Sequence, residues 1–158
     1  MRRASWIAIL LVCIAGAIAA QQPSQSGHGF DPATDPSGMY SFLKEGEFVQ
    51  ITLENGELSG FVSRFGENDS DRSQFIDQFF DKGSLKNDHL TFTTKTVHGI
   101  WYSFDGSIAK QPGKQPGQEG YRLIKGTLKQ HVSDVNHKDR VSERSVEFKS
   151  FPESVSRP

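Results

Sequence analysis

Five histidines follow the N-terminal apolar segment, and histidine is the side chain best suited to acid–base or metal chemistry near neutral pH. They are His28, His89, His98, His131 and His137. No two of them have the H-x-H or H-E-x-x-H spacing that brings two imidazoles to one metal ion. His98 is the strongest candidate for a site, because it precedes Gly99 and lies near Trp101 at an expected strand end. The alternative is a turn residue with positive φ.

An acidic segment with the spacing Asp69-x-Asp71-x-Ser73 resembles the start of a calcium loop. An EF-hand needs Gly at position six and Glu at position twelve, but Gln74 and Phe80 stand there. The segment therefore predicts a solvated acidic turn, with a weak calcium site as the alternative. The chain also lacks a G-x-S-x-G elbow and a glycine-rich phosphate loop. We expect no catalytic residue, no metal site and no cofactor.

Two segments suit binding better than catalysis. Residues 101–104, with the sequence WYSF, place aromatic rings on both faces of one expected strand, and filling of the core is the alternative use of those rings. Residues 110–117 repeat a basic tetrapeptide whose prolines and glycines favour successive turns, either as a flap over a barrel mouth or as a tolerated insertion. The candidate ligand-binding residues are Trp101, Tyr102, Phe104, His98, Lys110 and Lys114.

Short runs of alternating apolar and polar residues, separated by Gly, Asn and Asp, occupy residues 39–151 and predict half-buried strands. Asn55-Gly56 lies between two such runs and is the strongest short signal for a hairpin. His98-Gly99 predicts another turn. The expected strands are 48–53, 57–65, 90–96, 100–108, 121–129 and 144–151.

The segment 73–82 permits two predictions. As a helix, it begins at Ser73 and ends before Gly83, with Phe75 and Phe79 on its apolar face. As a strand, it alternates and ends in a turn at Lys82-Gly83. The strand is favoured because it fits a regular meander.

These runs predict an all-β fold, an antiparallel up-and-down β-barrel of roughly six to eight strands, since closure hides strand edges. A β-sandwich is the alternative. Glycines inside three of the runs favour the barrel, because small barrels curve at glycines and bulges. They are Gly60, Gly106 and Gly126.

The segment GMYSF…GEFVQITLENGELSGFVSRFG resembles the first hairpin of avidin-like and, more loosely, lipocalin-like barrels. WYSFDGSI, the polar loop and GYRLIKGTL resemble a later avidin-type hairpin, so the resemblance spans residues 38–130. It implies a calycin-like barrel with one ligand cavity. It does not imply biotin, because the stretch that matches the Tyr and Ser of the biotin site, residues 61–64, reads FVSR and lacks the Tyr, and Trp101 has no partner tryptophan. Gly38-Met39-Tyr40 lacks the Trp of the lipocalin signature.

The first twenty residues have the pattern of an export signal: a basic start, an apolar run at 6–19 and an A-x-A cleavage site at Ala17 and Ala19. A retained membrane anchor is the main alternative, but the run is shorter than the ~20 residues that a spanning helix needs. Lipidation of Cys13 and twin-arginine export are further alternatives. We expect a cleaved signal peptide at 1–20, a disordered leader at 21–38, a β-barrel domain at 39–151 and a frayed tail at 152–158, in a secreted or periplasmic protein.

Cleavage removes Cys13, the only cysteine, so the exported chain has no disulfide and depends on its core. Its 16 basic and 19 acidic residues, a net charge of −3, are no footprint of nucleic-acid binding. The charge is uneven, at −7 over residues 21–94 and +4 over residues 95–158. Complementary sheet faces are the simpler explanation, and a basic mouth for an anionic ligand is the sharper one.

Together these features predict an exported non-catalytic β-barrel that binds a small or apolar ligand, with no membrane span after signal cleavage. An envelope interaction or structural protein with a filled core is the alternative, and an uncharacterised hydrolase comes third. An interior cavity distinguishes the first two. The cavity is excluded if the inward side chains meet and fill the centre of the barrel. The side chains expected to point inward include Leu90, Phe92, Tyr102 and Phe104.

Overall fold

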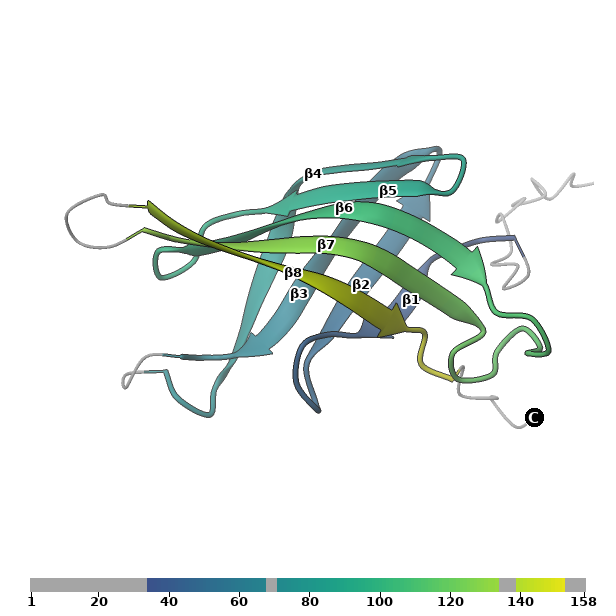
Figure 1. Cartoon of the computed structure of the whole chain (residues 1–158), viewed down its shortest axis with the longest axis horizontal. Helices are drawn as coiled ribbons and strands as arrows, with labels where there is room; N and C mark the ends of the chain where they lie inside the picture. Colours follow the sequence, from purple (N-terminus) through teal and green to yellow (C-terminus); the bar gives the residue numbers. More distant parts are fainter. Residues whose placement is uncertain (1–33, 68–70, 134–138, 153–158) are drawn as a thin grey trace, which may run out of the picture.

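The computed structural model describes residues 34–67, 71–133 and 139–152, and these form one antiparallel sheet of eight strands in sequence order (Figure 1). None of the described residues is helical, which confirms the all-β prediction. The strands are β1 (Gly38–Ser41), β2 (Phe48–Glu54), β3 (Glu57–Phe65), β4 (Phe75–Lys86), β5 (His89–Thr94), β6 (Ile100–Lys110), β7 (Arg122–Ser133) and β8 (Asp139–Lys149).

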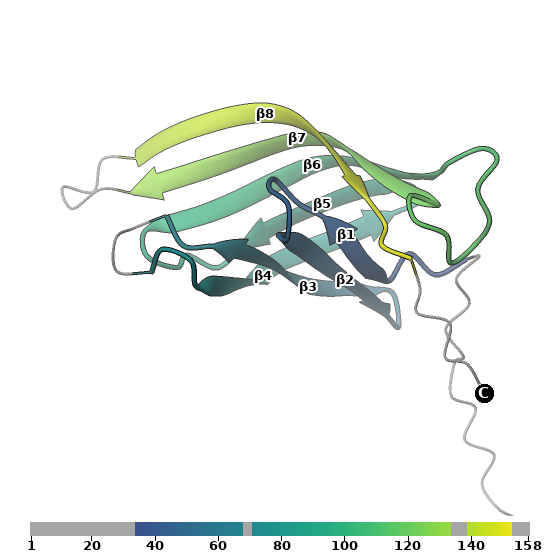
Figure 2. The same cartoon turned by 90° about the horizontal axis from the view of Figure 1, so that it is seen from below.

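The sheet curls on itself as a half-barrel, so that β1–β3 lie across the interior from β6–β8 (Figure 2). The first and last strands meet at one end. Tyr40 of β1 forms an antiparallel bridge with Ser150, which follows β8, and the Phe151 N–H donates to the Met39 carbonyl over 2.8 Å. Because β1 has only 4 residues and β8 has 11, the two edges are joined over a short stretch.

Two predicted turns are confirmed by their backbone angles. Asn55 and Gly56 have φ values of 53° and 81° between the paired residues Glu54 and Glu57. Both central positions are left-handed, as a tight two-residue hairpin requires. At the second turn His98 and Gly99 have φ values of 51° and 75°, and the flanking Val97 and Ile100 exchange two backbone hydrogen bonds of 2.9 and 3.0 Å.

The ambiguous segment 73–82 is a strand, since β4 runs from Phe75 to Lys86. The predicted turn at Lys82-Gly83 is wrong. A bulge between Phe80 and Lys82 lets β4 leave β3 and continue beside β5, and the chain turns at Asn87, whose φ is 55°. Gly83 instead lies within the strand, where a Cβ would come 2.7 Å from the Leu58 carbonyl oxygen.

Aromatic rings meet in the interior of the curl. Phe92 stacks between Phe80 and Phe104, with ring centroids 4.4 and 5.2 Å apart, and Phe104 contacts Phe148 at 5.9 Å. Leu90, Phe92, Tyr102 and Phe104 are all buried. This is the arrangement that the filled-core alternative predicts. The other buried hydrophobic residues are Tyr40, Phe42, Val49, Ile51, Leu58, Val62, Ile100, Ile108, Ile124, Leu128 and Phe148.

A buried polar pair bounds this apolar interior near the β5–β6 turn. The Arg64 Nε donates to Gln78 Oε1 over 2.6 Å, and the Gln78 Nε2 donates to the carbonyls of Ile100 (2.8 Å) and Lys95 (3.2 Å). The guanidinium carbon of Arg64 also lies 5.9 Å from the Tyr102 ring centroid. Gln78 therefore ties the turn to β3, and a polar network replaces apolar packing at this end.

The N-terminal boundary of the fold lies earlier than the sequence predicts. The expected leader reached residue 38, but the Leu53 N–H donates to Ser37 Oγ over 2.8 Å and the Tyr40 hydroxyl donates to the Pro36 carbonyl over 2.6 Å. These bonds, together with the buried Pro36, hold a short segment against the sheet. The predicted signal peptide and most of the leader and tail lie outside the described residues. Within the described chain, no helix is long and apolar enough to cross a membrane.

Candidate functional site

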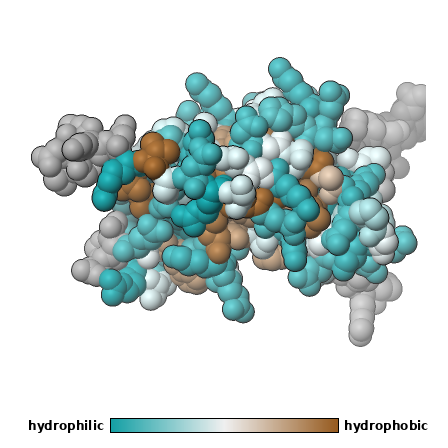
Figure 3. Space-filling model, in the orientation of Figure 1, coloured by the Kyte–Doolittle hydropathy of each residue, from teal (hydrophilic) through white to brown (hydrophobic). Residues whose placement is uncertain are grey.

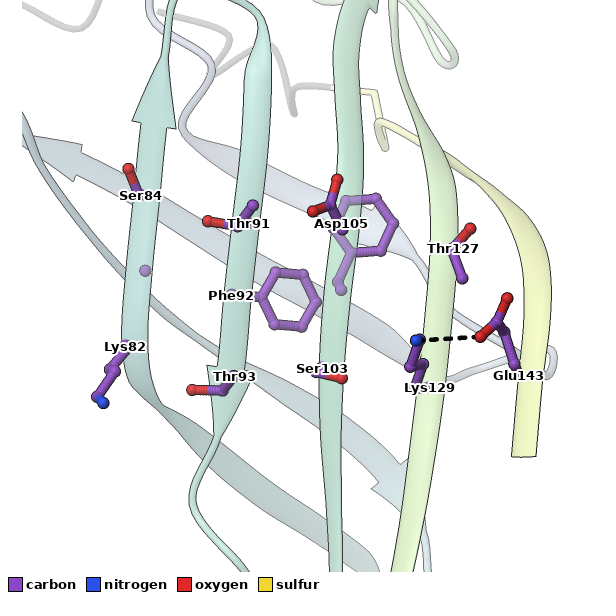
Figure 4. Close-up of a pocket in the computed structure, with 12 residues that line it drawn as sticks. Lys82, Ser84, Thr91, Phe92, Thr93, Ser103, Asp105, Thr127, Lys129 and Glu143 are labelled. Carbon is purple, nitrogen blue, oxygen red and sulfur yellow. Dashed lines mark ion pairs between the residues drawn. The ribbon is translucent and has the colours of Figure 1, made fainter. Parts of the chain in front are cut away.

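A shallow groove of about 680 Å³ crosses the outer face of β4–β8 (Figure 4). Because side chains alternate along a strand, the residues that flank the buried rings of β5 and β6 point outward. We call this the outer groove. Hydroxyl-bearing side chains are the largest group in its lining: Ser84, Thr91, Thr93, Ser103 and Thr127. The other lining residues are Lys82, Asp105, Lys129, Glu143, Gly83, Phe92 and Phe104. The face over β5–β8 is largely hydrophilic or neutral, with only scattered apolar side chains (Figure 3).

Trp101 forms an aromatic wall at one end of this face. It lies opposite His131 in the β6–β7 register, and the two rings stack with centroids 3.5 Å apart and planes 6° apart. The Ser103 hydroxyl lies 3.1 Å from His131 Nε2. A second hollow of about 510 Å³ is lined by Trp101 and shares Lys82 and Thr93 with the outer groove. We call the hydroxyl-bearing residues of the outer groove the hydroxyl row. The indole therefore lies beside this row, because the two hollows share Thr93.

Two of the four charged side chains along the outer groove pair with each other, and a third pairs with a histidine beside the groove. Lys129 Nζ lies 3.1 Å from Glu143 Oε2 (dashed line in Figure 4), and Asp105 Oδ1 lies 2.9 Å from His89 Nε2. Beside the groove, the hydrogen bond from Lys125 lowers the pKa of Glu147 below its ordinary value. Five hydroxyl groups line the same groove, and each of them can both donate and accept hydrogen bonds.

The structure separates the candidate residues that the sequence grouped. Trp101 lies on the outer face, whereas Tyr102 and Phe104 are buried in the core, and burial raises the pKa of Tyr102 to about 12. Phe104 also borders the outer groove from within the sheet. His98 lies in the β5–β6 turn, where its Nδ1 is 2.7 Å from Asp71 Oδ2 and its left-handed backbone is that of a turn residue.

Lys110 is the last residue of β6, at the opposite end of the strand from Trp101, and Lys114 lies in the loop that follows. Lys110 is nine positions after Trp101 along the extended strand, a span of about 30 Å. The loop after Lys110 forms two successive turns. The Lys114 N–H donates a hydrogen bond to the Gln111 carbonyl over 3.3 Å, and the Gln118 N–H donates one to the Gln115 carbonyl over 3.1 Å. The successive turns were predicted, but the loop does not border the Trp101 end of the sheet.

Sequence reasoning missed the hydroxyl row and His131. The signal for the row was present, because Thr91, Thr93 and Ser103 alternate with Phe92, Tyr102 and Phe104 in the same runs. The predicted strand 121–129 ends two residues before His131, so the sequence does not place His131 on the sheet. In the structure β7 continues to Ser133 and pairs with β8 from Leu123 to Ser133.

The calcium-like segment is only partly described, because Asp69 lies outside the described residues. The Asp71 carboxylate is buried and interacts with His98. Among the residues that the structure describes, no three His, Cys, Asp or Glu side chains are grouped as a metal site requires.

The fold and this site define an all-β protein built from one curled up-and-down sheet with a polar groove on its outside. No protein-family model, curated protein or solved structure matches the chain.

Proposed function

We propose that this chain is an exported, non-catalytic binding protein that holds its ligand in the outer groove instead of in an interior cavity. The observation that carries the proposal is the opposite orientation of two adjacent aromatic residues. Tyr102 is buried among the core rings, whereas Trp101 lies outside as a wall continuous with the hydroxyl row. A ligand that uses Trp101 therefore binds on the outer face.

The lining of the groove favours a ligand rich in hydroxyl groups, and a sugar chain has that chemistry. An indole with one face covered by His131 offers an apolar plane against which a pyranose ring can stack. Ser and Thr side chains offer donors and acceptors for the hydroxyls of the same ligand. A volume of about 680 Å³ lies in the range of small-molecule sites.

The proposal keeps the expected export signal and the secreted or periplasmic location, where free and polymeric sugars are accessible. The eight-stranded meander also supports the calycin-like resemblance, which remains part of the proposal. The interior ligand that such a barrel implies is not retained, since aromatic rings occupy the centre of the curl.

The test is isothermal calorimetry of the mature protein with soluble oligosaccharides of glucose, mannose and N-acetylglucosamine. We expect at least one of these oligosaccharides to bind, and we expect Trp101→Ala to weaken its binding tenfold or more. Thr93→Val removes one hydroxyl at nearly constant volume and should weaken binding by a smaller factor. Phe75→Ala, on another part of the sheet, is the control and should bind as the wild type does.

Two results would overturn the proposal. One is the absence of binding to every oligosaccharide in the panel. The other is tight binding of a fatty acid or isoprenoid that Trp101→Ala leaves unchanged, because that result would place the ligand inside the curl.

A further inference from the structure

Five phenylalanines gather on the outer face of β2–β4, away from the outer groove. Phe61 contacts Phe48 and Phe79, with ring centroids 5.9 and 5.5 Å apart, and Phe65 contacts Phe75 at 4.5 Å. Phe75 and Phe79 are 55% and 56% exposed. We call Phe48, Phe61, Phe65, Phe75 and Phe79 the phenylalanine face.

These rings are not needed for the core. On β4 the inward positions are held by Gln78, which is buried, and by Phe80, which stacks on Phe92 in the interior. Phe75 and Phe79 lie on the opposite face and leave more than half of their surface in water. The outward face of an antiparallel sheet is ordinarily polar, and exposed apolar side chains grouped on it indicate an interaction site.

The phenylalanine face carries acidic groups. Asp77 lies between Phe75 and Phe79 on β4 and pairs in register with Ser63 of β3. Glu54 and Glu57 flank the β2–β3 turn at the other end of this face, and all three acids are exposed. The ranges 48–54, 57–65 and 75–81 contain one basic residue, Arg64, and it is buried on the inner side.

We propose that the phenylalanine face docks a partner protein whose surface presents apolar side chains around a lysine or arginine. The apolar side chains would cover the exposed rings of Phe75 and Phe79, and the cation would meet Asp77 between them. A cation beside aromatic rings gains additional electrostatic attraction from their faces. This surface is independent of the outer groove, so it goes beyond the proposed function.

The charge pattern argues against the two other occupants of an apolar sheet face. In a symmetric dimer the same patch meets itself, which brings Asp77 and its neighbouring acids close to the identical acids of the second copy. An anionic lipid surface would repel the same acids, because such surfaces attract basic segments. A basic and apolar protein surface matches both properties of the phenylalanine face.

The test uses the mature protein and a fluorescently labelled synthetic peptide of alternating leucine and lysine. Fluorescence anisotropy should show binding of this peptide, and a matched peptide of leucine and glutamate should bind at least tenfold more weakly. Asp77→Lys should weaken binding of the lysine peptide tenfold or more. The double variant Phe75→Ser/Phe79→Ser should do the same, while circular dichroism confirms that each variant is folded.

Phe151→Ser is the matched control, since Phe151 is another exposed aromatic residue but follows β8. It should leave the affinity for the lysine peptide unchanged. Equal binding of the two peptides, or an unchanged affinity in Asp77→Lys, would overturn the proposal. So would sedimentation equilibrium showing a dimer that Phe75→Ser/Phe79→Ser abolishes, or flotation with phosphatidylglycerol vesicles that the same variant abolishes.

Discussion

The indole of Trp101 lies flat on the imidazole of His131, with the two planes 6° apart and the ring centroids at 3.5 Å. The two residues are directly opposite in the β6–β7 register, so the contact joins neighbouring strands on the outer face of the sheet. The Ser103 hydroxyl oxygen lies 3.1 Å from Nε2 at the edge of the same imidazole ring. The orientation of the indole is thus set by a strand pair and not by a loop.

His131→Ala should therefore loosen Trp101. Loss of the stacked ring exposes a second face of the indole, so we expect a red-shifted emission and stronger quenching by acrylamide. The stability cost should be about 0.5–1.5 kcal/mol, as for other aromatic pairs. Urea denaturation followed by circular dichroism measures that cost. His89→Ala, an exposed position on β5, is the control, and an unchanged emission in His131→Ala would show that the stack does not form in solution.

The Asn55-Gly56 turn should be sensitive to residue type. Replacement by Ala-Ala puts two alanines at φ values of 53° and 81°, in the left-handed region that alanine disfavours. We expect a loss of about 1–3 kcal/mol of unfolding free energy in urea denaturation, because each left-handed non-glycine position costs about 1 kcal/mol or more. Lys114→Ala, in the β6–β7 loop, is the control. A change within experimental error would contradict the hairpin.

Alternation predicted most of the strands and also the inward side of β6. The sequence places Tyr102 and Phe104 inward, and both are buried. Trp101 therefore points outward, but its sequence does not say which residue of the next strand lies beside it. The register with β7 places Trp101 opposite His131. Local sequence contains no information on that register, so the outward partner of Trp101 could not be predicted.

The segment 73–82 was ambiguous because both of its faces are aromatic. Phe75 and Phe79 point outward and Phe80 points inward, so the apolar residues satisfy a helical period as well as an alternating one. Only pairing with β3 and β5 decides between them. The same double-sided pattern is the sequence signal of the phenylalanine face, since a strand needs one apolar face for the core.

Gln78→Leu should destabilise the fold severely. The substitution keeps the volume but removes the acceptor of Arg64 Nε and the donor to the Ile100 carbonyl, and it leaves a buried guanidinium with fewer partners. We expect a loss of about 3 kcal/mol or more, because unpaired buried polar groups cost about 1–3 kcal/mol each and charged groups cost more. Gln130→Leu, at a partly exposed position on β7, is the control for thermal unfolding.

The alternative for Gln78 is that water replaces the lost partners. In that case Gln78→Leu would differ from the Gln130→Leu control by less than about 1 kcal/mol. That result would contradict a structural role for the buried polar pair.

Shortening of the β6–β7 loop should leave the outer groove intact. Deletion of residues 112–117 removes both proline-glycine turns, which lie about 30 Å along the sheet from Trp101. We expect oligosaccharide affinity to change by less than twofold in calorimetry, with the thermal midpoint near that of the wild type. A large loss of affinity in a folded deletion variant would show that the loop is part of the binding site.

The stability of the protein should fall in alkali because of buried tyrosines. Burial raises the pKa of Tyr102 from 10.0 to about 12, so the folded chain keeps a proton that the unfolded chain releases between these values. Stability that is fully present below pH 10 is therefore lost as the pH rises toward 12. The loss from this residue should be about 2–3 kcal/mol, at about 1.4 kcal/mol for each pKa unit.

Tyr102→Phe should flatten that decline, because phenylalanine has no proton to lose. Urea denaturation at pH 8, 10 and 11.5 measures the slope for each variant. Burial also raises the pKa of Tyr40, so Tyr102→Phe should reduce the slope without abolishing it. Tyr121→Phe, at a partly exposed position, is the control and should follow the wild type. If Tyr102→Phe loses stability as steeply as the wild type, the Tyr102 hydroxyl is accessible to water and the end of the core beside Arg64 is open.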